Sequence, residues 1–193
     1  MNIARLMYPV RVLGPGDRIG LWLAGCHRGC KGCSNPELWN QRPEYEIAVA
    51  DVMKLIRKVK ENHPVDGFTI SGGEPMDQAH ALAELVTELL YISSDILIYT
   101  GYRLEELQAR DDLATAFVLE HSAVLIDGAY MEERNDNSVL RGSSNQRIHI
   151  LDNSYSSLYQ SYIVQNENHI QNFTTSDGIV SVGIHHPGFR QPI

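Results

Sequence analysis

The sequence is poor in cysteine. It has three cysteines in 193 residues, and all of them, Cys26, Cys30 and Cys33, lie in one short stretch. An odd number of clustered cysteines is a poor framework for disulfides and favours a metal site in a reducing compartment. Because no fourth cysteine exists, the three thiols cannot complete an all-cysteine metal site.

Other features are also missing. No apolar run approaches the ~20 residues of a membrane helix, and the N-terminus lacks the apolar core and cleavage site of a signal peptide. The formal net charge of −8 argues against a general nucleic-acid-binding or anionic-membrane-binding surface. No repeat or low-complexity tract is present. We therefore expect a cytoplasmic protein with a single domain over residues 1–193.

What is present is an alternation of short apolar runs and helix-like segments. The patterns predict strands at residues 19–24, 67–71, 95–100, 123–126 and 146–151, and helices at residues 46–62, 78–91 and 104–118, the last broken near Asp111-Asp112. Such alternation predicts parallel β-α units, and nearly continuous apolar strands predict a sheet that is buried on both faces. We expect an α/β fold with a mostly parallel sheet of five or six strands. The chain is shorter than the ~250 residues of a full barrel, so we expect a partial TIM-like (β/α) barrel.

The last forty or so residues differ from this core, which spans about residues 10–150. Residues 155–193 form a C-terminal extension, in which we expect a hairpin between residues 168–174 and 179–184, with a turn at Ser176-Asp177-Gly178. His185 and His186 are expected to be surface or core histidines.

Distinctive residues follow four of the predicted strands. Cys26 follows the first, Ser71-Gly72-Gly73-Glu74-Pro75 the second, Thr100 the third, and Asp127 the fourth. Because ligand sites of parallel α/β folds lie at the carboxyl ends of the strands, their coincidence on one rim predicts a binding site. The alternative is structural, since glycines and aspartates are also common in tight turns.

The cysteine spacing, C-x3-C-x2-C, provides three thiolates for three irons of a [4Fe–4S] cluster and leaves the fourth iron open to a ligand. Structural zinc is the alternative, but zinc sites use four ligands, and His27 is poorly placed beside Cys26. The neighbouring Arg28 and Lys31 either favour the reduced cluster, contact an electron donor or belong to a solvated loop.

With these motifs the chain resembles the radical S-adenosylmethionine (SAM) superfamily. Within it, the chain is similar to the activases of glycyl radical enzymes, and most of all to those of anaerobic ribonucleotide reductase. The resemblance covers about residues 10–150 and is carried by the cysteine loop and by Gly14-Pro15-Gly16, Gly72-Gly73-Glu74-Pro75, Tyr99-Thr100-Gly101-Tyr102 and the segment 141–147. Gly32 replaces the aromatic residue that many members have before the third cysteine, which fits the reductase-activase type.

The resemblance implies a function. Reductive cleavage of SAM at the cluster produces a 5′-deoxyadenosyl radical, which installs a glycyl radical on a partner such as anaerobic ribonucleotide reductase. A flavodoxin or ferredoxin is the expected electron donor. The implied cluster ligands are Cys26, Cys30 and Cys33. The implied SAM-site residues are Gly72, Gly73, Glu74 and Pro75, followed by Thr100, Asp127, Asn145 and Arg147.

Two alternatives remain. One is a radical SAM enzyme that abstracts hydrogen from a small molecule or a peptide, with the C-terminal extension forming its pocket. The other is a non-catalytic iron–sulfur or zinc protein with a structural or sensing role.

Overall fold

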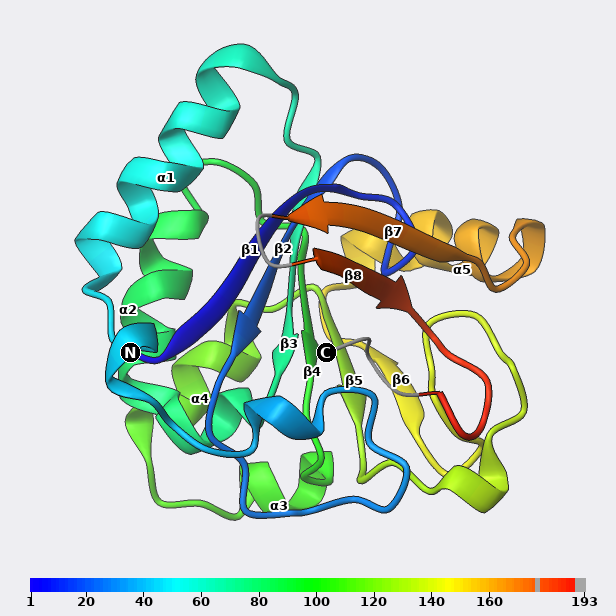
Figure 1. The fold of residues 1–193 in the computed structure, drawn as a ribbon. Coiled ribbons are helices and arrows are strands. Elements are labelled where there is room, and N and C mark those ends of the chain that lie inside the picture. Colours follow the sequence, from blue (N-terminus) through cyan, green and yellow to red (C-terminus); the bar gives the residue numbers. More distant parts are fainter. Residues whose placement is uncertain (176–177, 190–193) are drawn as a thin grey trace.

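The computed structural model describes residues 1–175 and 178–189 and contains a six-stranded sheet with strand order β1-β2-β3-β4-β5-β6 (Figure 1). Its strands are β1 (Ile3–Val10), β2 (Arg18–Leu23), β3 (Gly67–Gly72), β4 (Ile96–Tyr99), β5 (Val124–Asp127) and β6 (Arg147–Ile150). Strands β2 to β5 are paired in parallel, whereas β1 and β6 are antiparallel edge strands.

Helices connect the parallel strands. They are α1 (Val49–Asn62), α2 (Ala79–Leu89), α3 (Leu104–Gln108) and α4 (Leu113–Glu120), while α5 (Ser156–Gln165) follows β6. The short 3₁₀ helices are η1 (Pro36–Leu38), η2 (Pro43–Tyr45), η3 (Pro75–Gln78), η4 (Glu132–Arg134) and η5 (Asn153–Tyr155). In the described part of the chain, no helix has both the length and the apolarity needed to cross a bilayer.

The α/β class and the mostly parallel six-stranded sheet are confirmed, as are the five predicted strands and the predicted helices. The helix break at Asp111-Asp112 has a clear cause: the Asp112 carboxylate accepts hydrogen bonds from the amides of Ala114 and Thr115, and so caps α4. The sequence analysis did not predict β1 or α5. A closed barrel is not formed, because in the described residues the sheet begins at β1 and ends at β6 without a pairing between them.

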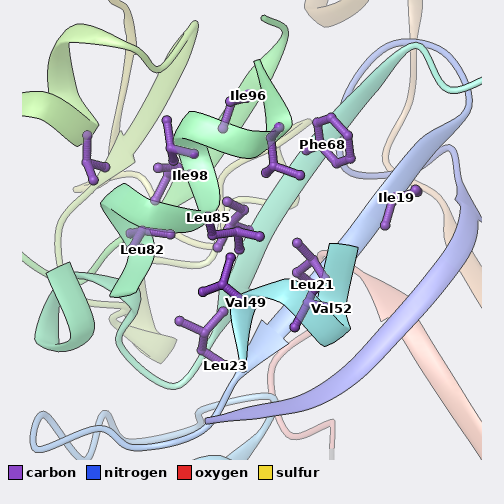
Figure 2. Close-up of a cluster of buried hydrophobic side chains, with 14 of the residues drawn as sticks. Ile19, Leu21, Leu23, Val49, Val52, Phe68, Leu82, Leu85, Ile96 and Ile98 are labelled. Carbon is purple, nitrogen blue, oxygen red and sulfur yellow. The ribbon is translucent and has the colours of Figure 1, made fainter. Parts of the chain in front are cut away.

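One face of the sheet packs against α1, α2 and α4. Alternate residues along the strands, such as Ile19, Leu21 and Leu23 of β2, point to this face, where they meet apolar side chains of the helices (Figure 2). Phe68, Ile70, Ile96 and Ile98 extend the same cluster across β3 and β4. The period of two along each strand places these residues on one side.

The other face is covered by C-terminal elements. Strand β7 (Ile170–Thr175) pairs antiparallel with β8 (Gly178–Gly183), which confirms the predicted hairpin; Ser176 and Asp177 of the predicted turn lie outside the described residues. Val182 and Ile184 pack in a cluster with Trp22, and Tyr159 of α5 packs with Leu97. In Figure 1, β7, β8 and α5 lie on the opposite side of the sheet from α1 and α2.

A buried hydrogen-bonded network joins α5 to the sheet. The guanidinium of Arg18 contacts the Asp95 carboxylate at 2.7 Å and the Thr69 hydroxyl at 2.8 Å. The Tyr159 hydroxyl donates to the same carboxylate at 2.6 Å. Arg18 and Tyr159 have no exposed surface. Because each buried polar group here has a partner, the network holds α5 in one position on the sheet.

Candidate functional site

A cavity of about 180 Å³ lies at the carboxyl ends of the central strands, and all three cysteines line it. Residues 71–74 at the end of β3 and just beyond, Thr100 and Gly101 after β4, and Gly128 after β5 line it as well. The opposite wall comes from residues 181–185, at the end of β8 and just beyond. The structure thus brings together residues from the strand ends that the sequence analysis placed on one rim.

The cysteine loop is held at its start by backbone hydrogen bonds. The amide of Gly25 donates to the carbonyl of Leu38, and that of Cys26 donates to the carbonyl of Trp39, each at 2.8 Å. Within the loop, the Cys33 amide donates to the Cys30 carbonyl at 3.1 Å. These bonds fold residues 26–39 back on themselves, so that cysteines separated by several positions reach the same cavity.

The cysteines are free thiols of intermediate burial. Burial raises the pKa of the Cys26 and Cys33 thiols above the usual range for cysteine. Iron ligation requires thiolates, so loading of the site releases protons and is favoured by higher pH.

The donor set fits a [4Fe–4S] cluster. In the described residues, no three side chains of histidine, cysteine, aspartate or glutamate are arranged to hold one metal ion. A cluster does not require such convergence, because each thiolate binds a different iron. The His27 side chain is 93% exposed, its Nδ1 lies 3.2 Å from the Asp77 carboxylate, and it is not among the described residues that line the cavity with the thiols.

The loop after β3 lies directly against the start of the cysteine loop. Gly72 has φ of +111°, and a Cβ at this position would lie 2.2 Å from the Leu23 carbonyl oxygen. The Glu74 amide donates to the Gly25 carbonyl at 2.7 Å. Glycine at position 72 is therefore required both by its backbone angle and by the close approach of β2.

Glu74 links the loop after β3 to the loop after β4. Its side chain is 1% exposed. Its Oε1 accepts from the Thr100 hydroxyl at 2.7 Å and the Met76 amide at 3.1 Å, and its Oε2 accepts from the Gly101 amide at 2.7 Å. Burial raises the pKa of Glu74, and these hydrogen bonds oppose that effect. The three donors are uncharged.

Arg28 is not a solvated loop residue. Its guanidinium carbon lies 4.0 Å from the ring centroid of Tyr102, and Arg110 approaches the same ring at 4.1 Å. The Arg28 Nε is 3.6 Å from the Glu74 carboxylate, and its side chain is 24% exposed. Lys31, in contrast, is exposed.

The other predicted SAM-site residues, Pro75, Asp127, Asn145 and Arg147, are not among the described residues that line the cavity. Pro75 is the first residue of η3. The Asp127 carboxylate accepts from the Arg147 guanidinium and from the Leu104 amide, the latter at 2.8 Å. Burial acts to raise the pKa of Asp127, but these hydrogen bonds outweigh it and lower the pKa to about 2. The assignment of these residues to SAM stays a prediction.

The loop before β6 reaches the cavity through Gln146, one residue from the predicted Asn145. The Gln146 side chain donates to the Gly128 carbonyl and accepts from the Gly142 amide, each at 2.8 Å. The Asn145 side chain instead donates to the Ala129 carbonyl at 2.8 Å. These contacts tie the loop before β6 to the loop after β5.

Tyr99 and His185 are among the polar cavity residues that the sequence analysis did not assign to the site. His185 is 7% exposed, and burial lowers its pKa to about 4, so the ring is neutral at physiological pH. The local sequence carried no signal for its position, because His185 reaches the cavity through the packing of β8 on the far face of the sheet. Tyr99 was detectable, since it precedes Thr100 at the end of a predicted strand.

Comparison with known proteins agrees with this site. A family model described as a 4Fe-4S single cluster domain matches residues 12–149. An anaerobic ribonucleoside-triphosphate reductase-activating protein from Vibrio cholerae is 36% identical over 149 residues, covering 74% of this chain and 94% of the relative. Proteins of the same name from Enterobacteria phage T4 and Escherichia coli K12 are 31% and 32% identical over 153 and 151 residues. These cover 77% and 75% of this chain, and 93% and 96% of the relatives.

Proposed function

Because the chain belongs to the family of anaerobic ribonucleoside-triphosphate reductase-activating proteins, with a 4Fe-4S single cluster domain, we propose that it is a radical SAM activase. Its partner is a glycyl radical enzyme such as anaerobic ribonucleotide reductase. The observation that carries the proposal is the meeting of three free thiols, with no fourth cysteine in the chain, and the Glu74 loop around one cavity.

Cys26, Cys30 and Cys33 hold the cluster, one thiolate to each of three irons. When bound, the cluster and SAM supply reductive cleavage of the sulfonium and the radical that abstracts hydrogen from the partner. The protein holds the thiolates at the start of the cysteine loop, where the amides of Gly25 and Cys26 are tied to η1 and Trp39.

Glu74 and the backbone of Gly72 and Gly73 orient the amino group of SAM. Support comes from the surroundings of Glu74, a buried carboxylate whose hydrogen bonds come from uncharged donors. Such a carboxylate attracts a cationic ligand in a medium of low dielectric constant. Thr100 acts by holding the carboxylate in place, and Pro75 by starting η3 directly after it.

Asp127, Asn145 and Arg147 support the rim around the site. Their side chains bind one another or nearby backbone, which favours a role in holding the loops over direct contact with SAM. The curled, partial TIM-like arrangement of the sheet is also part of the proposal.

A flavodoxin or ferredoxin supplies the electron in a reducing cytoplasm. The exposed Lys31, next to Cys30, offers a positive charge to an acidic donor of this kind. A reducing compartment suits three free thiols that line a common cavity.

Anaerobic assay of SAM cleavage tests the proposal. The cluster is reconstituted and reduced with dithionite, SAM is added, and 5′-deoxyadenosine is measured by liquid chromatography. We expect product from the wild type and none from Cys30→Ala. No product from a wild-type protein that carries about four irons and a reduced-cluster signal would contradict a catalytic role.

A second candidate is supported by the wall formed by residues 181–185. These residues line the cavity together with the cysteines, as would suit a pocket for a small-molecule or peptide substrate. Incubation with SAM and an anaerobic ribonucleotide reductase distinguishes the two. A glycyl radical signal in electron paramagnetic resonance supports the activase, whereas SAM cleavage without such a signal favours the second candidate.

A further inference from the structure

The C-terminal cap, defined here as residues 156–175 and 178–189, lies outside the match to the family model, which ends at residue 149. Its packing is nonetheless that of an integral element. Tyr159 reaches the buried Asp95 carboxylate, and Val182 and Ile184 belong to the same buried cluster as Trp22. The cap therefore has a defined position over the sheet.

The end of the cap is anchored on both sides of His185. The Asn135 side chain donates to the His185 carbonyl at 2.8 Å, and the Asn168 side chain donates to the Ile184 carbonyl at 2.6 Å. The imidazole stacks on the Phe189 ring, with centroids 3.6 Å apart and an interplanar angle of 10°. These contacts fix both the backbone and the ring plane of His185.

The two ring nitrogens of His185 differ in their contacts with the described residues. Its Nε2 lies 3.0 Å from the Ser181 hydroxyl. Its Nδ1 is buried and has no hydrogen-bond partner among the described residues. An unpaired buried polar atom is costly, and a ligand that supplies the missing hydrogen bond explains why it is retained.

A second unpaired atom comes from the sheet. The Tyr99 hydroxyl, at the end of β4, is buried and without a partner among the described residues. Tyr99 and His185 line the same cavity as the cysteines, and the Tyr99 ring packs on the cluster that contains Val182 and Ile184. The two residues that carry these unpaired atoms come from segments far apart in the sequence, and both line one cavity.

We propose that the C-terminal cap completes the SAM site, with His185 Nδ1 and Tyr99 Oη forming hydrogen bonds to bound SAM. The inference rests on the proposed function. It favours SAM over the partner protein because both residues line the cavity that holds the cysteines, and both atoms are shielded from solvent. Burial keeps His185 uncharged, which avoids repulsion of the SAM sulfonium.

Equilibrium dialysis of radiolabelled SAM against the anaerobically reconstituted full-length protein tests the inference. We expect His185→Ala to weaken SAM binding about tenfold, the effect of about one hydrogen bond to a buried group. His185→Asn, whose amide lies close to the position of Nδ1, should stay within about threefold of the wild type. Tyr99→Phe removes only the hydroxyl and should weaken binding about fivefold.

His186→Ala is the matched control, because His186 is the adjacent histidine and is exposed. We expect it to bind SAM like the wild type. Iron content and the thermal midpoint are measured for each variant. If His185→Ala loses its cluster, Tyr99→Phe decides the question, since it removes only a hydroxyl and preserves the ring.

The outcomes separate this inference from the proposed function. Wild-type affinity for SAM in both His185→Ala and Tyr99→Phe would overturn the inference and leave the activase intact. Normal SAM binding combined with failure to transfer the radical would also overturn the inference and leave the activase intact. In that case His185 and Tyr99 would contact the partner protein and not SAM. Failure of the wild-type holoprotein to bind SAM would overturn both.

Discussion

Glu74, just after β3, and Asp127, the last residue of β5, are buried carboxylates at the same edge of the sheet, and their surroundings differ. The Glu74 carboxylate accepts hydrogen bonds from a hydroxyl and two amides, while the nearest guanidinium, that of Arg28, lies 3.6 Å away. The Asp127 carboxylate is bound by the guanidinium of Arg147.

The difference sets opposite pKa shifts. Burial dominates at Glu74 and raises its pKa, whereas at Asp127 hydrogen bonds, led by that from Arg147, overcome burial and lower the pKa to about 2. Burial alone therefore does not determine what a carboxylate does. Glu74 lies beside a cavity and has uncharged hydrogen-bond donors, with Arg28 3.6 Å away, which suits ligand binding, whereas Asp127 is bound directly by Arg147.

The largest expected effect is that of Glu74→Gln on activity. The variant keeps the size of the side chain but removes the negative charge offered to the amino group of SAM. We expect 5′-deoxyadenosine formation to fall roughly a thousandfold. The assay is liquid chromatography at equal cluster content, and Asp127→Asn is the control. Comparable losses of activity in the two variants would contradict the assignment of ligand binding to Glu74 and of a structural role to Asp127.

Asp127→Asn should act on stability. It removes the charge that Arg147 binds, but Arg147 is 41% exposed and can be hydrated, which limits the loss. We expect the variant to be about 2 kcal/mol less stable, with a thermal midpoint lower by about 6 °C. Thermal unfolding followed by circular dichroism measures this. An unchanged midpoint would show that the Arg147 contact contributes nothing to stability.

The two carboxylates should also respond oppositely to acid. Asp127 has a lowered folded-state pKa, so its stabilising contribution is present above the reference value of 3.8 and is lost as the pH falls towards 2. Glu74 has a raised pKa, so its contribution is present below the reference value of 4.5 and is lost as the pH rises through its folded value.

Urea unfolding of the cluster-free protein between about pH 6 and pH 3 checks these signs. Relative to the wild type, Asp127→Asn should lose less stability on acidification, and Glu74→Gln should lose more. Parallel pH profiles for the two variants would contradict the assignment of opposite shifts.

The smallest expected effect is that of Glu105→Gln. Hydrogen bonding to Arg147 lowers the pKa of Glu105 to about 2, the same value as for Asp127. The Glu105 side chain is 64% exposed, however, so solvent screens the ion pair. We expect the thermal midpoint to change by less than about 2 °C. A shift as large as that of Asp127→Asn would mean that Glu105, and not burial of Asp127, governs this network.

Much of the fold could be predicted because its signals are local. The apolar runs of β2 to β5 and the helical stripes between them each lie within one segment, and the glycines that follow mark their ends. β1 was missed because its inward-facing and outward-facing residues are both apolar, with Ile3, Leu6 and Met7 on a single strand. α5 was missed because it buries one residue, Tyr159, and so lacks a clear apolar stripe.

The candidate site also has one part that the sequence predicted and another that depended on tertiary structure. The spacing of Cys26, Cys30 and Cys33 by itself determined the three-thiolate donor set, because all three cysteines of the chain lie on one short loop. Tertiary structure decided that Glu74 has uncharged hydrogen-bond donors, that Asp127 is bound by Arg147, and that His185 lines the same cavity as the cysteines. These outcomes depend on which strand ends and which hairpin meet in space, and no segment of the sequence contains that information alone.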